Sequence, residues 1–381
     1  MRVLIVGGGV AGLTLAAKLA CQGREPLVVE QLSCHGEHGF SVSLYPYGSA
    51  VLHGIGAYRE LATRAVQMKT YEIGDRRGTV IRRIDFARLL GAYGPTYFTT
   101  HAQLIDCLRR ACGERVQLRM GSTVSALEQA GEEVEATLSD GSTERFDLVV
   151  GCDGAHSVTR DLLFGPQRGF DTGWVGWTWW APEGIFPPET AREHWLAGAL
   201  FGAYPAPGQT MCIIAVPRSV ADPADELDER ELLARLGGAL GRLAGTPELA
   251  AALASASEVW PWRLHDVRSR RLSSGRVVLC GDAGAAFLPT AGVGASVALH
   301  CAAALGEELS RADARLVPLA IERYVNRTVN TVRANQRDSR RLARAMFLQS
   351  PLAARGRELL IRHTPVRMMI GSILVAMGQP L

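Results

Sequence analysis

The chain has 381 residues, of which 47% are hydrophobic and 21% charged, and its formal net charge is +3. This composition excludes an intrinsically disordered chain, and the weak, dispersed positive charge argues against nucleic acid as a partner. The length exceeds the roughly 250–300 residues at which one hydrophobic core stops growing, so we expect one large domain or two closely joined ones.

The N-terminal segment predicts a strand, a glycine turn and a helix, in the order of a dinucleotide-binding unit. Residues 3–6 form a buried apolar run, residues 7–12 (GGGVAG) match GxGxxG, and residues 13–20 continue with helical periodicity. The glycines permit the tight turn, the close approach of a pyrophosphate and the packing of helix on strand. The cofactor-binding residues predicted here are Gly7, Gly9, Val10, Ala11 and Gly12.

A second strand is predicted over residues 26–29, and it ends in Glu30. An acidic side chain at this spacing accepts hydrogen bonds from ribose hydroxyls and disfavours a 2′-phosphate. These residues leave open whether the dinucleotide is NAD or FAD. Since the first strand follows Met1 almost at once, we expect no signal peptide and a cytoplasmic location.

Cysteines, arginines and the apolar C-terminal run are interpreted as structural features. The eight cysteines show no C-x-x-C spacing, and Cys152 and Cys280 end apolar runs, which predicts buried, reduced thiols. The arginines of residues 333–344 alternate with apolar residues as on a solvated helix face. Residues 368–377 form too short an apolar run to span a bilayer, and no metal site is predicted.

Two later segments decide the identity of the dinucleotide. Residues 147–160 (DLVVGCDGAHSVTR) read as a strand followed by DGxxSxxR, and residues 276–294 combine a strand ending in GD with PxxGxG. With the N-terminal motif, they resemble the FAD-dependent aromatic hydroxylases, the single-component flavoprotein monooxygenases related to p-hydroxybenzoate hydroxylase. The resemblance covers Met1 to roughly Val332. It implies FAD, a ribityl contact from the Asp282 carboxylate, and further cofactor residues at Asp153, Gly281, Asp282, Pro289, Gly292 and Gly294.

The resemblance also has departures and finer implications. Members often carry histidine where this chain has Ala285, and arginine where it has His101, which is kept as a candidate for the cofactor phosphates. Residues 39–45 align with the family stretch that passes along the flavin ring. Ser41 and Val42 are the backbone contacts predicted there.

A separate substrate module is predicted between the DG and GD motifs. This region holds all seven tryptophans, with strand-like alternation around residues 177–179 and over 210–216. The resemblance implies a sheet that roofs the flavin and an apolar, aromatic-walled substrate cavity. The candidate substrate residues are Tyr45, Trp177, Trp179 and Tyr204, while His194 is a further polar residue of the roof. No catalytic residue is predicted, because a general base must lie within hydrogen-bond distance of the substrate and residue type alone does not show this.

The predicted fold class is α/β: a Rossmann-type FAD-binding domain with an inserted, mainly β-sheet substrate domain and C-terminal helices. The FAD-binding domain is assigned residues 1–70, 101–165 and 269–340, and the substrate domain residues 71–100 and 166–268. Residues 341–381 form the C-terminal helices, which we expect to bridge the two domains rather than face a second subunit. The chain is predicted to be a monomer or a homodimer.

The resemblance implies a monooxygenase that uses NAD(P)H and O2. The reduced flavin would react with O2, and the C4a-hydroperoxide would hydroxylate a hydrophobic, aromatic or polycyclic small molecule. No second GxGxxG follows Gly12, so the nicotinamide would bind transiently. Residues 176–182 (GWTWWAP) partly resemble the GWxWxIP signature of flavin-dependent halogenases, with Lys69 as the catalytic lysine. A reductase or dehydrogenase acting on isoprenoid double bonds, or a non-catalytic flavin protein, is a further alternative.

Overall fold

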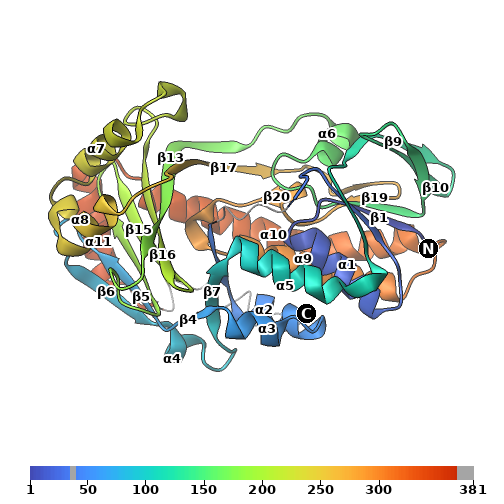
Figure 1. The fold of residues 1–381 in the computed structure, drawn as a ribbon, viewed down its shortest axis with the longest axis horizontal. Coiled ribbons are helices and arrows are strands. Elements are labelled where there is room, and N and C mark those ends of the chain that lie inside the picture. Colours follow the sequence, from blue (N-terminus) through green and yellow to red (C-terminus); the bar gives the residue numbers. More distant parts are fainter. Residues whose placement is uncertain (35–39, 367–381) are drawn as a thin grey trace.

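A computed structural model describes residues 1–34 and 40–366 of the chain, and these form two halves built on separate sheets (Figure 1). One half carries the glycine turn and the other carries the tryptophan-rich strands. The predicted combination of a Rossmann-type FAD-binding domain and a β-sheet substrate domain is confirmed.

The first half is a six-stranded sheet in the order β18-β19-β12-β1-β2-β8, parallel except for the edge strand β18. Both faces are covered, which explains why its inner strands are continuous apolar runs. In β1, Val3 and Ile5 pack against the helices, whereas Leu4 and Val6 pack against a three-stranded antiparallel sheet. The strands are β18 (Ser273–Ser274), β19 (Val277–Leu279), β12 (Leu148–Gly151), β1 (Val3–Val6), β2 (Leu27–Glu30) and β8 (Gln117–Met120), with β9 (Val124–Ala130), β10 (Glu133–Leu138) and β11 (Thr143–Phe146) behind them.

Helices α1 (Val10–Cys21), α5 (His101–Cys112) and α9 (Gly294–Ser310) cover the other face of this sheet. Helix α6 (Val158–Phe164) follows β12. Cys152 and Cys280 directly follow β12 and β19 and are buried thiols without a disulfide, as predicted. Their burial in this core explains the apolar sequence around them.

The second half is an eight-stranded sheet in the order β20-β17-β13-β16-β15-β14-β5-β6. Its long strands β13 and β17 run from one half of the molecule to the other (Figure 1). Helices α7 (Glu229–Leu240) and α8 (Pro247–Ala254) pack on one face. The strands are β20 (Ala285–Ala286), β17 (Trp260–Arg268), β13 (Phe170–Pro182), β16 (Gln209–Pro217), β15 (Leu200–Ala206), β14 (Thr190–Trp195), β5 (Thr70–Gly74) and β6 (Val80–Asp85).

A small three-stranded sheet, β3-β7-β4, lies between the halves. Its strands are β3 (Ser41–Leu44), β7 (Thr96–Thr100) and β4 (Val66–Met68), and the short helices near it are α2 (Pro46–Gly54), α3 (Tyr58–Thr63) and α4 (Phe86–Leu90). The 3-10 turns η4 (Gly281–Ala283) and η5 (Pro289–Ala291) precede α9.

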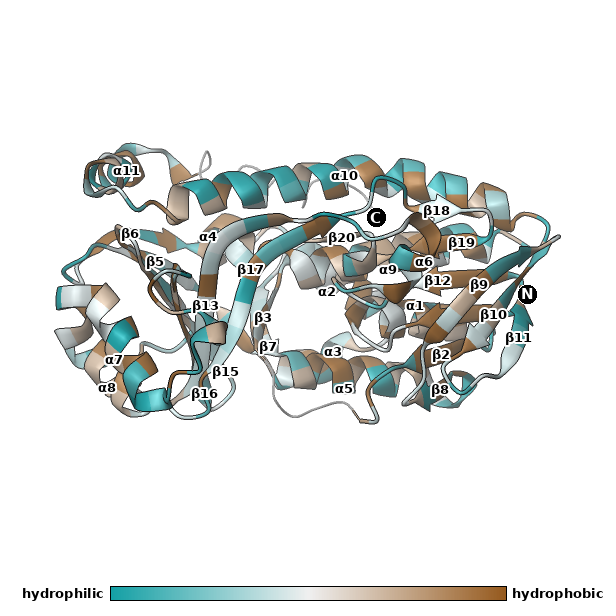
Figure 2. Cartoon of the chain, turned by 90° about the horizontal axis from the view of Figure 1, so that it is seen from above, coloured by the Kyte–Doolittle hydropathy of each residue, from teal (hydrophilic) through white to brown (hydrophobic). Residues whose placement is uncertain are grey.

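Helix α10 (Val317–Met346) spans both halves, and its outer surface is mostly hydrophilic (Figure 2). The buried amide of Gln336 donates to the carbonyl oxygens of Val267 and Ala286. Arg340 forms a bidentate pair at 2.6 Å with Asp266, so one arginine of the predicted solvated face instead neutralises a fully buried carboxylate.

The C-terminal helix α11 (Pro351–His363) contacts β6 of the second half, and its Arg357 donates to the carbonyl of Trp195. The apolar run 368–377 lies outside the described residues. Within the described ranges, no helix is both long and apolar enough to cross a bilayer, and no cluster of potential metal ligands occurs.

Candidate active site

The glycine turn between β1 and α1 is shaped by two close backbone contacts. A Cβ atom on Gly12 would lie 1.9 Å from the carbonyl oxygen of Gly7, and one on Gly7 would lie 2.5 Å from that of Cys152. Gly7 also has a φ of +107°, which favours glycine. In contrast, a Cβ on Gly9 would meet nothing within 4 Å. Gly9 therefore keeps a space open at the N-terminus of α1, as a bound pyrophosphate requires.

Glu30 lies where the sequence placed it, at the end of β2 beside the glycine turn. Its carboxylate accepts from the backbone N–H of Gly8 at 2.7 Å and of Leu32 at 2.9 Å. Each carboxylate oxygen retains a further lone pair for a ribose hydroxyl. The unit thus has the geometry of an adenosine site, although Val10 and Ala11 contribute through backbone position alone.

The three sequence motifs meet around the first turn of α1. Gly281 approaches Ala11 so closely that a Cβ there would lie 2.8 Å from the Ala11 side chain. Arg160, buried and at the end of the DGxxSxxR motif, donates to the carbonyl of Ala283 at 3.4 Å. Arg160, for which the sequence predicted no role, therefore joins the DG and GD segments.

Asp153 has a local role in this arrangement. Its carboxylate accepts from the Ser157 hydroxyl at 2.6 Å and from the Thr159 N–H at 2.8 Å, which shapes the loop entering α6. The backbone of Asp153 packs beside Gly7. The structure therefore brings Asp153 to the glycine turn, while its side chain is committed to its own loop.

Asp282 is the one carboxylate of the three motifs without a hydrogen-bond partner among the described residues. Burial raises the pKa of Asp282 to about 6. An acceptor held in this way fits the ribityl hydroxyls of FAD, which would supply the missing donors. With the open space at Gly9, this carboxylate makes the site compatible with FAD.

The PxxGxG segment folds against the strand that was predicted to border the flavin ring. The Ser43 hydroxyl donates to the carbonyl of Gly292 at 2.6 Å, and the Tyr45 hydroxyl donates to that of Ala291 at 3.2 Å. Gly292 has a φ of +61°, and Pro289 opens the preceding turn η5. Gly294 begins α9 with no side-chain cap, and a Cβ atom on it would meet nothing within 4 Å. The free N–H groups there can face an anionic flavin ring.

Three other predicted residues lie at this border. The Ser41 N–H contacts the sulfur of Met211 at 3.0 Å and thereby ties β3 to the eight-stranded sheet, while Val42 is buried beside it. The ring of His101 stacks on Phe40 at 5.1 Å, at the first residue of α5. A phosphate contact by His101 stays a prediction.

Trp177 and Trp179 are not brought to this border. Together with alternate residues of β15 and β16, they face α7 and α8 in the apolar cluster on the far side of the sheet. The indole N–H of Trp179 donates to the carbonyl of Ala252 in α8. The sequence does not determine which strand face meets the flavin, and the alternation fixed only that both rings share one face.

The near face of the sheet instead carries a buried carboxylate that sequence reasoning missed. Glu193 of β14 accepts from the Tyr204 hydroxyl and from the Trp195 indole N–H, each at 2.6 Å. Its neighbour His194 points the other way and contacts the Asp75 carbonyl through Nδ1 at 3.0 Å. A single acid within a largely buried strand was the available signal.

Lys69 lies away from these residues. Its ammonium group pairs with Glu189 at 2.8 Å, and about half of the side chain (52%) is exposed. Nothing in its placement supports the halogenase alternative.

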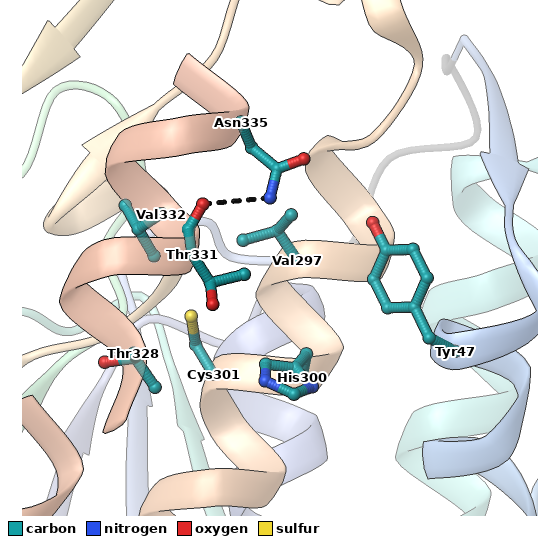
Figure 3. Close-up of a pocket in the computed structure, with 8 residues that line it drawn as sticks. All are labelled: Tyr47, Val297, His300, Cys301, Thr328, Thr331, Val332 and Asn335. Atoms are coloured by element: carbon teal, nitrogen blue, oxygen red, sulfur yellow. Dashed lines mark hydrogen bonds between the residues drawn. The ribbon is translucent and has the colours of Figure 1, made fainter. Parts of the chain in front are cut away.

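A separate hollow between α2, α9 and α10 is too small for a substrate (Figure 3). Its volume is about 10 Å³, and Tyr47, His300 and Asn335 point toward it. This volume accommodates roughly one water molecule. The region where the three sequence motifs meet is therefore the better candidate site.

Comparisons with known proteins agree with an FAD-binding chain. The "FAD binding domain" family matches residues 1–329. A 3-amino-4-hydroxybenzoate 2-monooxygenase of Streptomyces cremeus is 31% identical over 309 residues, covering 79% of this chain and 76% of that protein. The enzyme PtmB3 of Streptomyces platensis, named for the same activity, is 30% identical over 353 residues, covering 89% and 87%.

A solved structure of a variant of HpxO from Klebsiella pneumoniae, complexed with FAD, superposes with a TM-score of 0.88 at 21% identity, covering 99% of this chain and 98% of that one. The fold and the matched family define the class as FAD-dependent flavoproteins. The chain belongs to the FAD-binding domain family and is an FAD-dependent monooxygenase.

Proposed function

We propose that the enzyme hydroxylates an aromatic small molecule, with O2 as the source of the inserted oxygen and NAD(P)H as the electron donor. The observation that carries this proposal is the contact of β3 with the PxxGxG segment. Through Tyr45 and Ser43, this contact sets a tyrosine-bearing sheet face beside the loop expected at the flavin ring. The two Streptomyces relatives, which are named for oxygenation of a substituted benzoate, support an aromatic ring as the substrate.

Different residues of the chain would bind the cofactor and orient the substrate. Gly9, Glu30 and Asp282 would hold the dinucleotide, and Gly294 at the start of α9 would direct N–H groups toward the flavin. When bound and reduced, FAD supplies the oxygen-activating chemistry. Tyr45, which follows β3, and Tyr204 of the eight-stranded sheet would orient the substrate ring and keep water away.

The test is a labelling experiment on the purified protein. We expect a bound-flavin absorbance spectrum, NAD(P)H oxidation that accelerates with an aromatic substrate, and a product that carries one atom from isotopically labelled O2. A panel of hydroxy- and aminobenzoates, phenols and bicyclic rings would be used. Turnover that continues without O2 would instead indicate a dehydrogenase, and protein that fails to take up FAD would contradict the proposal.

A further inference from the structure

Glu193 is surrounded by hydrogen-bond donors on the near face of the eight-stranded sheet. Tyr204 of β15 and Trp195 of β14 donate to its two oxygens at 2.6 Å, and Tyr71 of the paired strand β5 lies near enough to lower its pKa. Glu193 is only 4% exposed. Such a buried acid is tolerated because each oxygen has a donor.

The carboxylate is balanced by donors and by no cation. Among the residues that the structure describes, none forms an ion pair with Glu193, and the nearby guanidinium of Arg357 in α11 packs over the Trp195 ring and binds backbone carbonyls. Burial raises the pKa of Glu193, while Tyr204, Tyr71 and Trp195 lower it. The facing hydroxyls of Tyr71 and Tyr204 have pKa values raised by burial and then by the charge of Glu193, so they stay protonated.

These contacts fix the direction of the Tyr204 hydroxyl. The Trp195 N–H can only donate, so it occupies Oε2, and the single Tyr204 proton goes to Oε1. The oxygen of Tyr204 then has only lone pairs left to offer. The Trp195 bond is fully buried, whereas the Tyr204 bond is partly exposed, so the open end of the cluster is at Tyr204.

A glycine makes this arrangement possible. Gly202 lies directly opposite Glu193 in the pairing of β14 with β15. A Cβ at Gly202 would lie 2.8 Å from the Tyr204 hydroxyl oxygen and from its ring. Without a side chain there, Tyr204 can lie back across the strand and reach Glu193.

The cluster lies close to the proposed flavin border. The charge of Glu193 contributes to the raised pKa of Tyr45, whose hydroxyl donates to the carbonyl of Ala291 in η5. The Tyr204 ring stacks on Phe98 of β7 at 6.0 Å, and β7 pairs with β3. The Tyr204 side chain therefore lies where the eight-stranded sheet meets β7, whose partner β3 contacts the PxxGxG segment.

We propose that Glu193 fixes Tyr204 as a hydrogen-bond acceptor in the substrate site, so that the enzyme selects aromatic rings with a neutral hydroxyl or amino donor. This inference rests on the proposed function and names its substrate class. A phenolate is disfavoured there because its charge would face Glu193 and a Tyr204 oxygen with no proton to donate. A hydrogen bond accepted from a ring substituent also makes the ring more electron-rich, which suits attack by an electrophilic oxygen.

Replacement of Glu193 by glutamine should turn Tyr204 from a hydrogen-bond acceptor into a donor toward the substrate. In Glu193→Gln, the Trp195 N–H still needs an acceptor and occupies the amide oxygen, so the amide NH2 faces Tyr204. Tyr204 must then accept from the amide, and its own proton turns toward the ligand. The variant should therefore favour acceptors such as a phenolate or a methyl ether.

The experiment uses the FAD-loaded enzyme with 4-fluorophenol and 4-fluoroanisole as probes, followed by ¹⁹F NMR across pH. In the wild type, we expect the pKa of the bound phenol to lie above its free value, and in Glu193→Gln to fall by about one unit or more. We also expect the wild type to prefer the phenol to the anisole by about tenfold, and Glu193→Gln to lose that preference.

Two variants keep the test independent of the folding of Glu193→Gln. Gly202→Ala, which displaces the Tyr204 hydroxyl and leaves both partners present, should lose the same preference. Tyr58→Phe removes a tyrosine hydroxyl that contacts Tyr97 instead, and should behave as the wild type. Unchanged phenol pKa and preference in Gly202→Ala or Glu193→Gln would overturn the inference, even if the wild type hydroxylates rings. A wild type that hydroxylates no ring would instead count against the proposed function.

Discussion

The candidate cofactor region and the candidate substrate region differ in what determines their shape. On the cofactor side, glycines and backbone groups set the shape: Gly7, Gly12 and Gly281 each allow a contact that a side chain would block. On the substrate side, side-chain direction sets the chemistry, as in the hydrogen bonds of Tyr204 and Trp195 to Glu193. A site defined by backbone is visible in a sequence motif, whereas a site defined by the facing of side chains is not.

The sharpest way to test the backbone side is a pair of glycine substitutions in the same turn. Gly12→Ala places a methyl group 1.9 Å from the Gly7 oxygen and should abolish FAD binding together with folding, since backbone cannot yield cheaply. Gly9→Ala has free space and should leave thermal stability of the FAD-free protein unchanged while FAD affinity falls. Thermal melts with and without FAD check both. Equal behaviour of the two variants would contradict the different roles assigned to these glycines.

The two faces of the eight-stranded sheet can be separated in the same way. Trp179→Ala should destabilise the protein by about 3–5 kcal/mol, because the buried ring fills the cluster against α7 and α8. The fraction that stays folded should keep the phenol preference of the wild type. Denaturant unfolding and ligand titration measure the two effects. A Trp179 variant with normal stability and an altered ligand preference would indicate that the substrate binds on the Trp179 face of the sheet, which contradicts our proposal.

The sequence predicted the backbone geometry of the glycine turn closely and the arrangement of the eight-stranded sheet only in outline. The spacing of Gly7, Gly9 and Gly12, followed by Glu30, fixes a local backbone geometry that needs no tertiary information. Trp177 and Trp179 were identified as a pair, yet the choice of face depends on α7 and α8, which lie far along the chain from both rings. Glu193 draws its role from Tyr71, Trp195 and Tyr204, and three separate strands must align before that role exists.

The joint between the two sides provides a third test. Arg340→Ala would leave the fully buried Asp266 without its bidentate partner, which we expect to destabilise the protein by about 3 kcal/mol. The double variant Arg340→Ala with Asp266→Asn should recover part of this loss. Calorimetry would measure both. A single variant as stable as the wild type would show that α10 does not secure β17 through this pair.

Substitution of Asp282 should have the smallest effect on stability. It should stabilise the folded protein but weaken its binding of FAD. Its folded-state pKa is raised to about 6, so the folded FAD-free protein binds the Asp282 proton more tightly than the unfolded chain. Protonation of Asp282 therefore stabilises the fold at low pH, and this contribution is lost as the pH rises toward and through 6. Asp282→Asn should therefore stabilise the FAD-free protein at pH 7, on the order of 1 kcal/mol for this half-buried group, while FAD binding weakens. Melting temperatures of the wild type and Asp282→Asn, measured against pH with and without FAD, would show both effects. A variant that is less stable without FAD would contradict the assignment.

The most direct measurement is a crystal structure of the enzyme with FAD and an aminophenol bound. The account predicts FAD along Glu30, Gly9 and Asp282, and a ring hydroxyl or amino group donating to the Tyr204 oxygen at about 2.6–3.2 Å, with Tyr204 still bonded to Glu193. FAD bound there but with the substrate ring on the Trp179 face of the sheet, or with Tyr204 donating to the ligand, would contradict this expectation.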